Sequence, residues 1–398
     1  MNPDLDRLHP YPFQKMAVLH AGITPPADLS RIALSIGEPK HSTPTLITEA
    51  CSQHLHGLAS YPTTRGESAL RSTIAHWLQQ RFGLQDNSID PEKHILPVNG
   101  TREALFAFAQ CIIDRRENPL ILMPNPFYQI YEGAAILAGA EPWFMNTTRE
   151  TDYLPDFDAI PESVWQRCQL LYLCSPGNPT GAVMHTQALQ SLLDKADKYD
   201  FVIASDECYS EIYFDETSPP PGLLSACQQS GRDKFERCMV FHSLSKRSNA
   251  PGLRSGFVAG DATLIEQFFA YRTYHGCAMP PVTQAASIAA WSDEQHVQEN
   301  RQLYRNKFSA VMDILGPVMN VSLPAASFYL WPETAIDDQH FSQGLLETQN
   351  VVVLPGSYLS RETESGNPGK NYVRMALVAP LDDCVEAAWR MRQFVTGD

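Results

Sequence analysis

Lys246 is the residue in this sequence whose neighbours are best suited to chemistry. It ends the segment His242-Ser243-Leu244-Ser245-Lys246, which follows an apolar run, and Arg254 comes eight residues later. An amine that condenses with an aldehyde must first lose its proton, and burial beside other cations lowers the pKa of a lysine. Arg254 and the two serines supply donors suited to a phosphate monoester. The alternative is an ordinary surface lysine that follows a strand.

One kind of cofactor meets both demands, because it carries an aldehyde and a phosphate on the same molecule. Pyridoxal 5'-phosphate is such a molecule, and the segment around Lys246 predicts that it is the cofactor. Three other strand ends carry residues that could complete its site. They are the turn 175–181 with Asn178, the pair Asp206 and Tyr209 after the strand 201–205, and Gly100-Thr101-Arg102 after the strand 94–98.

These strand ends are the expected places for a ligand, because open α/β sheets bind ligands beyond the carboxyl ends of their strands. Backbone N–H groups at a helix start, such as the one that follows Gly100, bind anions. Each of the residues could instead be structural: Asn178 could hold its turn, Asp206 could cap a helix, and Tyr209 could pack in the core.

Arg374 lies in the middle of a β-like run, Asn371-Tyr372-Val373-Arg374-Met375-Ala376. A guanidinium at a buried strand position is costly unless it is paired. We expect its partner to be a carboxylate, such as that of a substrate.

The order of the elements predicts an α/β fold. Short apolar runs that end in Gly, Pro, Asn or Asp alternate with segments of helical period, which is typical of a parallel sheet with helices on both faces. The predicted strands are 94–98, 120–123, 141–145, 170–174, 201–205, 238–242 and 256–259, and the predicted helices are 102–113, 127–138, 186–199 and 262–272. We expect a mostly parallel seven-stranded sheet between helices, in a large cofactor-binding domain over residues 46–290.

After residue 290 the pattern changes to that of a smaller α+β domain over residues 291–398. A long polar helix at 294–315 precedes strand-like runs at 327–331, 351–354 and 372–377, and a helical segment at 380–395 follows. Residues 1–45 are expected to form an N-terminal arm and to complete the smaller domain.

Composition narrows the class of protein. A chain of 398 residues with 43% hydrophobic residues is longer than one hydrophobic core usually supports, so two domains are expected. The net charge of -15 argues against a nucleic-acid partner. Nine cysteines, an odd number without metal-ligand spacing, predict reduced core residues and no metal site. No apolar run approaches the ~20 residues needed to cross a bilayer, and the start has no signal-peptide pattern. We therefore expect a cytoplasmic protein without a membrane part.

Taken together, these segments resemble the class I and II pyridoxal-phosphate aminotransferases of fold type I over essentially the whole chain. Asn178 lies 28 residues before Asp206, and Lys246 lies eight before Arg254, which agrees with that family. Cys208 departs from it, because relatives often carry a small β-branched residue there. The matching pieces are Tyr61-Pro62 with Gly66 and Leu70-Arg71, Asn99-Gly100-Thr101, Pro126-Phe127-Tyr128, Pro176-Gly177-Asn178-Pro179-Thr180-Gly181, Asp206-Glu207-Cys208-Tyr209, Ser243-Leu244-Ser245-Lys246, Pro251-Gly252-Leu253-Arg254 and Arg374.

The resemblance implies a catalytic role for several of these residues. Lys246 would hold the cofactor covalently and then act as general base and acid. Asp206 would pair with the ring nitrogen, Asn178 and Tyr209 would donate to the phenolic oxygen, and Tyr128 would stack against the ring. Substrate amino acids and 2-oxo acids would react in turn, with ping-pong kinetics.

The resemblance also implies a homodimer with shared active sites. Arg374 would clamp the α-carboxylate of the substrate, with Gly37 and Asn178 close by. The phosphate would be bound by Gly100, Thr101, Arg102, Ser243, Ser245 and Arg254 of one subunit and by Tyr61 of the other.

The segments 1–13, 33–41 and 57–66 are similar to bacterial N-succinyldiaminopimelate aminotransferases of lysine biosynthesis. This implies transfer between N-succinyl-L,L-2,6-diaminopimelate and 2-oxoglutarate, in either direction. An aminotransferase for an aromatic amino acid, aspartate or alanine remains an alternative, as does a β-lyase or decarboxylase. A cofactor-sensing transcription regulator is disfavoured, because no basic module precedes the core. We expect the succinyl end to be read by Arg272-Thr273-Tyr274-His275 or by Arg65.

Overall fold

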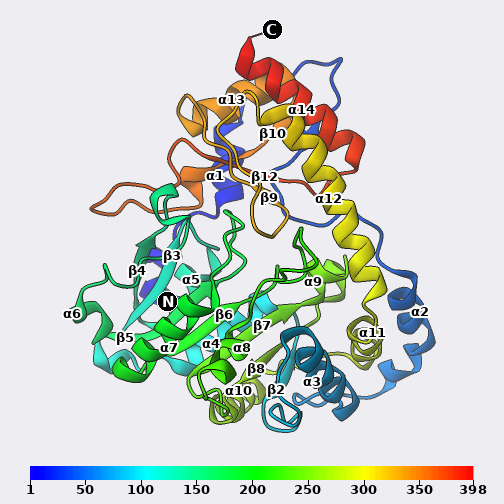
Figure 1. Ribbon diagram of the computed structural model, residues 1–398, viewed down its shortest axis with the longest axis vertical. Coiled ribbons are helices and arrows are strands. Elements are labelled where there is room, and N and C mark those ends of the chain that lie inside the picture. The colour runs from blue at the N-terminus through cyan, green and yellow to red at the C-terminus, as the bar shows by residue number, and fades with distance from the viewer. Residues whose placement is uncertain (398) are drawn as a thin grey trace.

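A twisted sheet of seven strands forms the lower half of the molecule in the computed structural model, which describes residues 1–397 (Figure 1). The spatial order is β2-β8-β7-β6-β5-β3-β4. The five strands β3, β4, β5, β6 and β7 all run parallel to one another. Strand β8 runs antiparallel to both of its neighbours, β2 and β7. The strands are β2 (Ile95–Val98), β3 (Leu120–Asn125), β4 (Glu141–Asn146), β5 (Cys168–Cys174), β6 (Val202–Asp206), β7 (Cys238–Ser243) and β8 (Gly256–Gly260). All seven predicted strands are present, and the predicted fold class is confirmed.

Side chains that alternate along the strands build two hydrophobic cores, one on each face of the sheet. Ile203 and Val240 point into one core, while the next residues along each strand, Ala204 and Phe241, point into the other. The first face is covered by α3 (Ser68–Phe82), α7 (Thr186–Tyr199), α8 (Leu223–Gln229) and α11 (Pro281–Trp291), and the second by α4 (Thr101–Ile112), α5 (Ile130–Ala138) and α10 (Ala262–His275). Because both faces are covered, the strands are almost continuously apolar.

Segments from the N-terminal and C-terminal parts of the chain meet above the large sheet, around a third core that contains Ile32, Leu34 and residues of the last hundred positions (Figure 1). The N-terminal β1 (Ile32–Ala33) pairs in parallel with β10 (Val351–Val352), and β11, β12 and β9 form an antiparallel sheet. The remaining elements here are β9 (Tyr329–Leu330), β11 (Leu354–Pro355), β12 (Val373–Ala376), α1 (Pro12–Leu19), α12 (Gln295–Leu315), α13 (Asp338–Gln349) and α14 (Leu381–Thr396). The N-terminal β1 thus pairs with a strand of the C-terminal part of the chain, whereas the division into an arm at 1–45 and domains at 46–290 and 291–398 stays a prediction.

Two predicted elements differ in the structure. The run 351–354 is not one strand, because Val351–Val352 pairs with β1 whereas Leu354–Pro355 turns to pair with β12. The helix predicted at 127–138 begins only at Ile130, because Tyr128 belongs to the turn that leads to the ligand cavity described below.

Within residues 1–397, no helix combines the length and the apolar character needed to span a membrane. The short helices α2 (Thr45–Gln53), α6 (Glu162–Trp165) and α9 (Leu244–Arg247) complete the set.

Three buried charged side chains connect the large sheet's helices to α12, the yellow helix in Figure 1. Glu211 accepts from Arg81 of α3 at 2.6 Å and lies 3.7 Å from Arg301 of α12. Burial alone would raise the pKa of Glu211, but Arg81, Arg247 and Arg301 outweigh it and hold the pKa below its usual value. The carboxylate therefore stays ionised, pairs with Arg81 and shares Arg301 with Glu216, which accepts from Arg301 at 2.9 Å.

Replacing this carboxylate should destabilise the fold. In the variant Glu211→Gln, Arg81 loses its carboxylate partner, Arg301 keeps only Glu216, and the free energy of unfolding should fall by about 3–5 kcal/mol. Urea unfolding of the variant and the wild type at pH 7 measures the difference. The control is Glu162→Gln, because Glu162 pairs with Lys198 at 3.6 Å and its side chain is 65% exposed. The control should lose less than about 1 kcal/mol.

The difference in unfolding free energy between wild type and Glu211→Gln should depend on pH. A carboxyl whose folded pKa is depressed stabilises the fold above its unfolded pKa, about 4.3 for Glu, and loses that contribution as the pH falls through the folded pKa. The gap between wild type and Glu211→Gln should therefore shrink below about pH 4. Equal losses in both variants at pH 7 would contradict the assignment.

Candidate active site

A cavity of about 470 Å³ lies at the carboxyl ends of β5, β6 and β7. It brings together most of the predicted site residues, namely Gly37, Thr101, Arg102, Tyr128, Asn178, Asp206, Tyr209, Ser243, Ser245, Lys246, Arg254 and Arg374. Gly100 adjoins it, because a Cβ at this position would overlap the guanidinium of Arg254. Tyr61 does not line the cavity of its own chain, and its side chain is fully exposed.

Lys246 reaches into this cavity from α9, the short helix that follows β7. The helix begins at Ser243, whose Oγ accepts from the backbone N–H of Ser245 at 3.1 Å. The Nζ of Lys246 donates to the carbonyl of Gly37 at 2.6 Å. Burial lowers the pKa of Lys246 to about 8, and Arg374 and Arg254 contribute to the shift. About a tenth of the amine is therefore neutral at pH 7, far more than at the ordinary pKa of a lysine, and the neutral amine is the nucleophile for an aldehyde.

Asp206 ends β6 at the wall of the cavity and is buried. Its Oδ2 accepts from the hydroxyl of Tyr131 at 2.7 Å, and its Oδ1 accepts from the N–H of Cys208 at 3.3 Å. Burial raises the pKa of Asp206, against the effect of these donors. Among residues 1–397, no cationic side chain lies within 4.0 Å of it. A protonated ring nitrogen would supply the missing cation.

Arg374 projects from β12 into the same cavity. Its Nη1 donates to Oδ1 of Asn178 at 2.9 Å, and its Nη2 donates to the carbonyl of Ser35 at 2.8 Å. The guanidinium carbon lies 4.4 Å from the ring centroid of Tyr329. Its Nε is buried without an acceptor, and no carboxylate of the described chain pairs with it. The group is positioned for a carboxylate that the protein itself does not provide.

An anion site lies at the start of α4. Gly100, at φ 87°, is the N-cap of this helix, and the absence of a Cβ lets the guanidinium of Arg254 approach the helix N-terminus. Arg254 itself has φ 52° and donates to the carbonyl of Pro251 at 2.9 Å. The hydroxyls of Ser243 and Ser245 face the same cavity. Backbone amides, hydroxyls and a guanidinium together suit a phosphate monoester.

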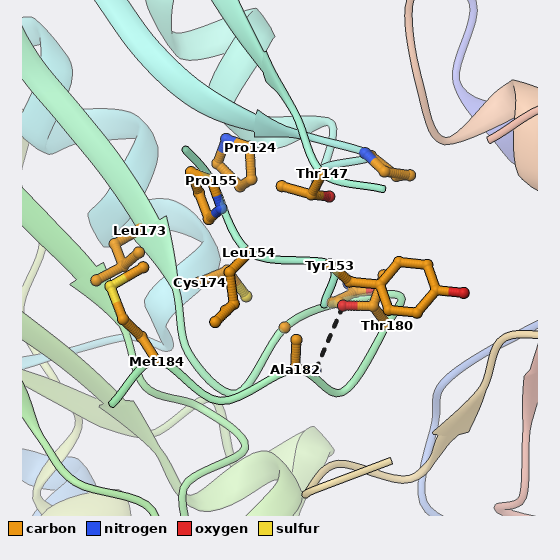
Figure 2. A pocket seen from close by; sticks show the side chains of 13 residues that line it. Pro124, Thr147, Tyr153, Leu154, Pro155, Leu173, Cys174, Thr180, Ala182 and Met184 are labelled. Atoms are coloured by element: carbon orange, nitrogen blue, oxygen red, sulfur yellow. Dashed lines mark hydrogen bonds between the residues drawn. The ribbon is translucent and has the colours of Figure 1, made fainter. Parts of the chain in front are cut away.

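The turn that carries Asn178 is packed from behind (Figure 2). A small cavity of about 20 Å³, the size of one water, remains between this turn and the segment 153–155. Leu154, Leu173 and Met184 surround it, and Ala182 N–H donates to Oγ1 of Thr180 at 3.3 Å within the turn. The carboxamide of Asn178 is held toward Arg374 by the hydrogen bond that its Oδ1 accepts from Nη1 at 2.9 Å.

Two tyrosines of the cavity were missed by sequence reasoning. Tyr11, just before α1, accepts a hydrogen bond from Nη2 of Arg102. Tyr329 of β9 lies 3.1 Å, hydroxyl to hydroxyl, from Tyr209, and a Cβ at Gly37 would overlap its hydroxyl. Tyr11 could have been noticed between its two prolines in Pro10-Tyr11-Pro12, whereas nothing in the sequence distinguishes Tyr329 from a core residue of a strand.

The cations expected to read the far end of the substrate do not line the cavity of their own chain. Arg272 is fully buried, and its Nη1 lies 2.9 Å from both carboxylate oxygens of Glu103. Arg65 pairs with Glu266 at 2.5 Å and stacks on Phe269. These contacts argue against a free cation at either position.

Comparison with known proteins places this geometry in a family. The model of the family "Aminotransferase class I and II" matches residues 30–383. The chain belongs to this family. It is 33% identical over 368 residues to an LL-diaminopimelate aminotransferase of Desulforudis audaxviator, covering 91% of this chain and 89% of that protein.

Solved structures agree. An aminotransferase from Neisseria meningitidis is 49% identical with a TM-score of 0.95, covering 99% of this chain and all of that one. A probable N-succinyldiaminopimelate aminotransferase from Thermus thermophilus is 26% identical with a TM-score of 0.82, covering 92% and 95%. Members of the family depend on pyridoxal phosphate, and this aminotransferase uses the same cofactor. The unpaired carboxylate of Asp206, the lysine amine and the anion site at α4 fit the ring nitrogen, aldehyde and phosphate of that cofactor.

Covalent labelling should identify the reactive lysine. Borohydride reduction of the holoenzyme followed by peptide mapping should find the cofactor on Lys246, because its amine faces the cavity. Lys307 is an internal control, since burial lowers its pKa to about 8 as well, but it lies outside the cavity. A label on Lys307, or on no lysine, would contradict the assignment.

The rate of capture should depend on pH. Because the neutral amine is the nucleophile, covalent capture of pyridoxal phosphate by the cofactor-free enzyme should accelerate as the pH rises toward about 8 and level off above it. Stopped-flow absorbance measures the rate. An increase that continues unchanged toward pH 10 would mean that the lysine has an ordinary pKa.

Proposed function

We propose that this enzyme transfers an amino group between N-succinyl-L,L-2,6-diaminopimelate and 2-oxoglutarate, in the diaminopimelate branch of lysine biosynthesis. The observation that carries transamination is the buried guanidinium of Arg374, without a carboxylate of its own, in the same cavity as the amine of Lys246. An α-amino or α-oxo acid supplies that carboxylate. Support for this substrate comes from the Thermus thermophilus relative and from the similarity of segments 1–13, 33–41 and 57–66 to enzymes of this type.

The residues around Lys246 divide the chemistry among them. The bound cofactor supplies a ring that accepts the electrons of the broken Cα–H bond. Lys246 would remove the proton from the substrate Cα and deliver it to the carbon that carried the cofactor's aldehyde, as general base and then general acid. Asp206 keeps the ring nitrogen protonated, and Asn178 and Tyr209 donate to the phenolic oxygen. Arg374, held by Asn178 and Ser35, would fix the α-carboxylate and so orient the substrate Cα relative to the amine of Lys246.

The remaining predicted residues hold the cofactor in place. Tyr128 stacks on its ring, and Gly37 leaves space for Tyr329 beside the substrate. The phosphate binds at the N-terminus of α4, formed by Gly100, Thr101 and Arg102. The side chains that contact it are Ser243, Ser245, Arg254 and Tyr61 of a second subunit. Tyr61, Leu55 and Leu58 are exposed on one segment, which favours a homodimer formed through this surface.

Free LL-diaminopimelate is the second candidate donor. The relative from Desulforudis audaxviator is named for that substrate, and it covers nearly the whole chain. The two donors share the reacting L-amino centre and differ in whether the distal amine carries a succinyl group. The residues that distinguish the two donors therefore lie in the outer part of the cavity, away from Lys246.

A direct comparison of the two donors tests both proposals. Each donor is assayed at a fixed concentration of 2-oxoglutarate, with glutamate formation as the measurement. A kcat/KM at least tenfold higher for the succinylated donor supports the first proposal, and the opposite ratio supports the second. Turnover of neither donor, with good turnover of an aromatic amino acid, aspartate or alanine, would refute both.

Arg374 should matter equally to both half-reactions. Removing a buried guanidinium that binds a carboxylate in two places should cost about 3–5 kcal/mol of transition-state binding in Arg374→Gln. Arg374→Lys should recover only part of it, because an ammonium cannot form the planar fork. Single-turnover rates with the amino donor and the 2-oxo acceptor measure the two halves separately. Damage to one half alone would show that Arg374 does not bind the α-carboxylate.

A further inference from the structure

The carboxamide of Asn300, in α12, contacts the short helix that carries Lys246. Its Nδ2 donates to the backbone carbonyl of Lys246 at 3.3 Å and to that of Arg247 at 3.4 Å. Both carbonyls lie in the last turn of α9, a helix of only four residues, and so have no partner within it. Asn300 is 3% exposed, so bulk water does not compete for its carboxamide. Asn300 thus closes the C-terminal end of α9, as the Oγ of Ser243 closes the N-terminal end.

The oxygen of the same carboxamide is held by two further side chains. Oδ1 of Asn300 accepts from Nδ2 of Asn249 at 2.9 Å and lies 2.8 Å from Nδ1 of His41. Nε2 of His41 lies 2.6 Å from Nζ of Lys307. Because burial lowers the pKa of His41, its ring is neutral near pH 7. Nε2 then accepts from Lys307, and Nδ1–H donates to Asn300. The carboxamide therefore turns its oxygen to two donors and its nitrogen to two carbonyls.

The N-terminal segment 37–41 contacts Lys246 at both ends of its side chain. The carbonyl of Gly37 accepts directly from Nζ of Lys246 at 2.6 Å. His41, four residues later, reaches the backbone of the lysine through Asn300. A lysine amine stands on a flexible four-carbon stem, so its place in the cavity depends on where its backbone is held. These contacts define that place from two directions.

We propose that Asn300 is a positioning residue for Lys246: it closes α9, ties it to residues 37–41, and so sets where the amine stands in the cavity. The inference rests on the proposed role of Lys246 and names the residue that orients it. Asn300 does not line the cavity, so it acts through the backbone of the lysine. Its loss should slow the steps that the amine performs, and leave binding at the anion site of α4 unchanged.

Covalent capture of pyridoxal phosphate by the cofactor-free enzyme tests the proposal. Stopped-flow absorbance measures its rate, and borohydride reduction with peptide mapping identifies the lysine. Asn300→Leu has a similar size and loses every hydrogen bond of the carboxamide. Asn300→Asp, which is ionised at about pH 8, keeps an acceptor for His41 but has no donor for the carbonyls. The matched control is Asn306→Asp, because Asn306 lies on the same helix, is exposed and accepts from Gln302.

Capture should be about 10- to 100-fold slower in both Asn300 variants, because a nucleophile that is slightly misplaced reacts more slowly. It should be unchanged in Asn306→Asp. Pyridoxine 5'-phosphate carries an alcohol in place of the aldehyde and cannot bond to a lysine, so its dissociation constant should be the same in all variants. In turnover, deuterium at the donor Cα should slow the Asn300 variants more than the wild type, since removal of that proton by Lys246 becomes the slower step.

An asparagine that only stabilises the fold would give another pattern. The melting temperature would fall, while capture well below that temperature and the isotope effect would stay as in the wild type. That pattern would overturn the proposal, and so would equal losses of capture rate and of pyridoxine 5'-phosphate affinity. If Asn300→Leu does not fold, Asn300→Asp alone decides, because it keeps the size of the side chain. A cofactor label on a lysine other than Lys246 in the wild type would instead refute the assigned role of Lys246.

Discussion

The parallel alignment of β5, β6 and β7 is the constraint on which the site depends. In register, Cys174 pairs with Asp206, and Asp206 pairs with Phe241, so the three strands end at one level of the sheet. Asn178 follows the first strand, Asp206 ends the second, and Lys246 follows the third. Residues far apart in the sequence therefore meet in one cavity without any long loop to carry them. The antiparallel β8 adds to this group, because its entry brings Arg254 back to the same edge.

The alternation of side chains along β6 separates two adjacent acids. Asp206 faces the cavity, whereas Glu207 accepts from Ser205 Oγ and from Leu223 N–H, both at 2.9 Å, and lies 3.2 Å from His242. Both carboxylates are buried, but the oxygens of Glu207 already have partners within the protein. Only Asp206 has unsatisfied capacity for a cation, and this difference, not burial, distinguishes a ligand-binding acid from a structural one.

Much of the fold and of the cavity could be predicted from the sequence, because both follow from local patterns. The seven strands are short apolar runs with clear ends, and Asn178, Asp206 and Lys246 stand directly after such runs. Arg374 could be singled out because a charged residue in an apolar strand requires an explanation. The helix α3 has the same kind of signal, since it buries Leu70, Ile74, Trp77 and Leu78 at helical spacing, and it is therefore predictable from the sequence as well.

The rest depends on contacts between distant segments, which no local pattern contains. Tyr329 looks like any strand residue until it is seen packed against Gly37. Arg65 and Arg272 looked available from their positions, but Glu266 and Glu103, which neutralise them, are 201 and 169 residues away in the sequence. The contact between Arg102 and Tyr11 is likewise not predictable from a local pattern, because the two residues meet only through the fold of the N-terminal segment.

One short stretch of backbone holds two of the reacting cations. The carbonyl of Ser35 accepts from Arg374, and the carbonyl of Gly37, two residues later, accepts from Lys246. An amine bonded to the cofactor has fewer N–H groups to donate, so cofactor loading weakens the attachment of this stretch at Gly37 and leaves the one at Ser35. The backbone of residues 35–37 therefore connects the carboxylate clamp to the amine through two hydrogen bonds, of which only the one at Gly37 depends on the free amine.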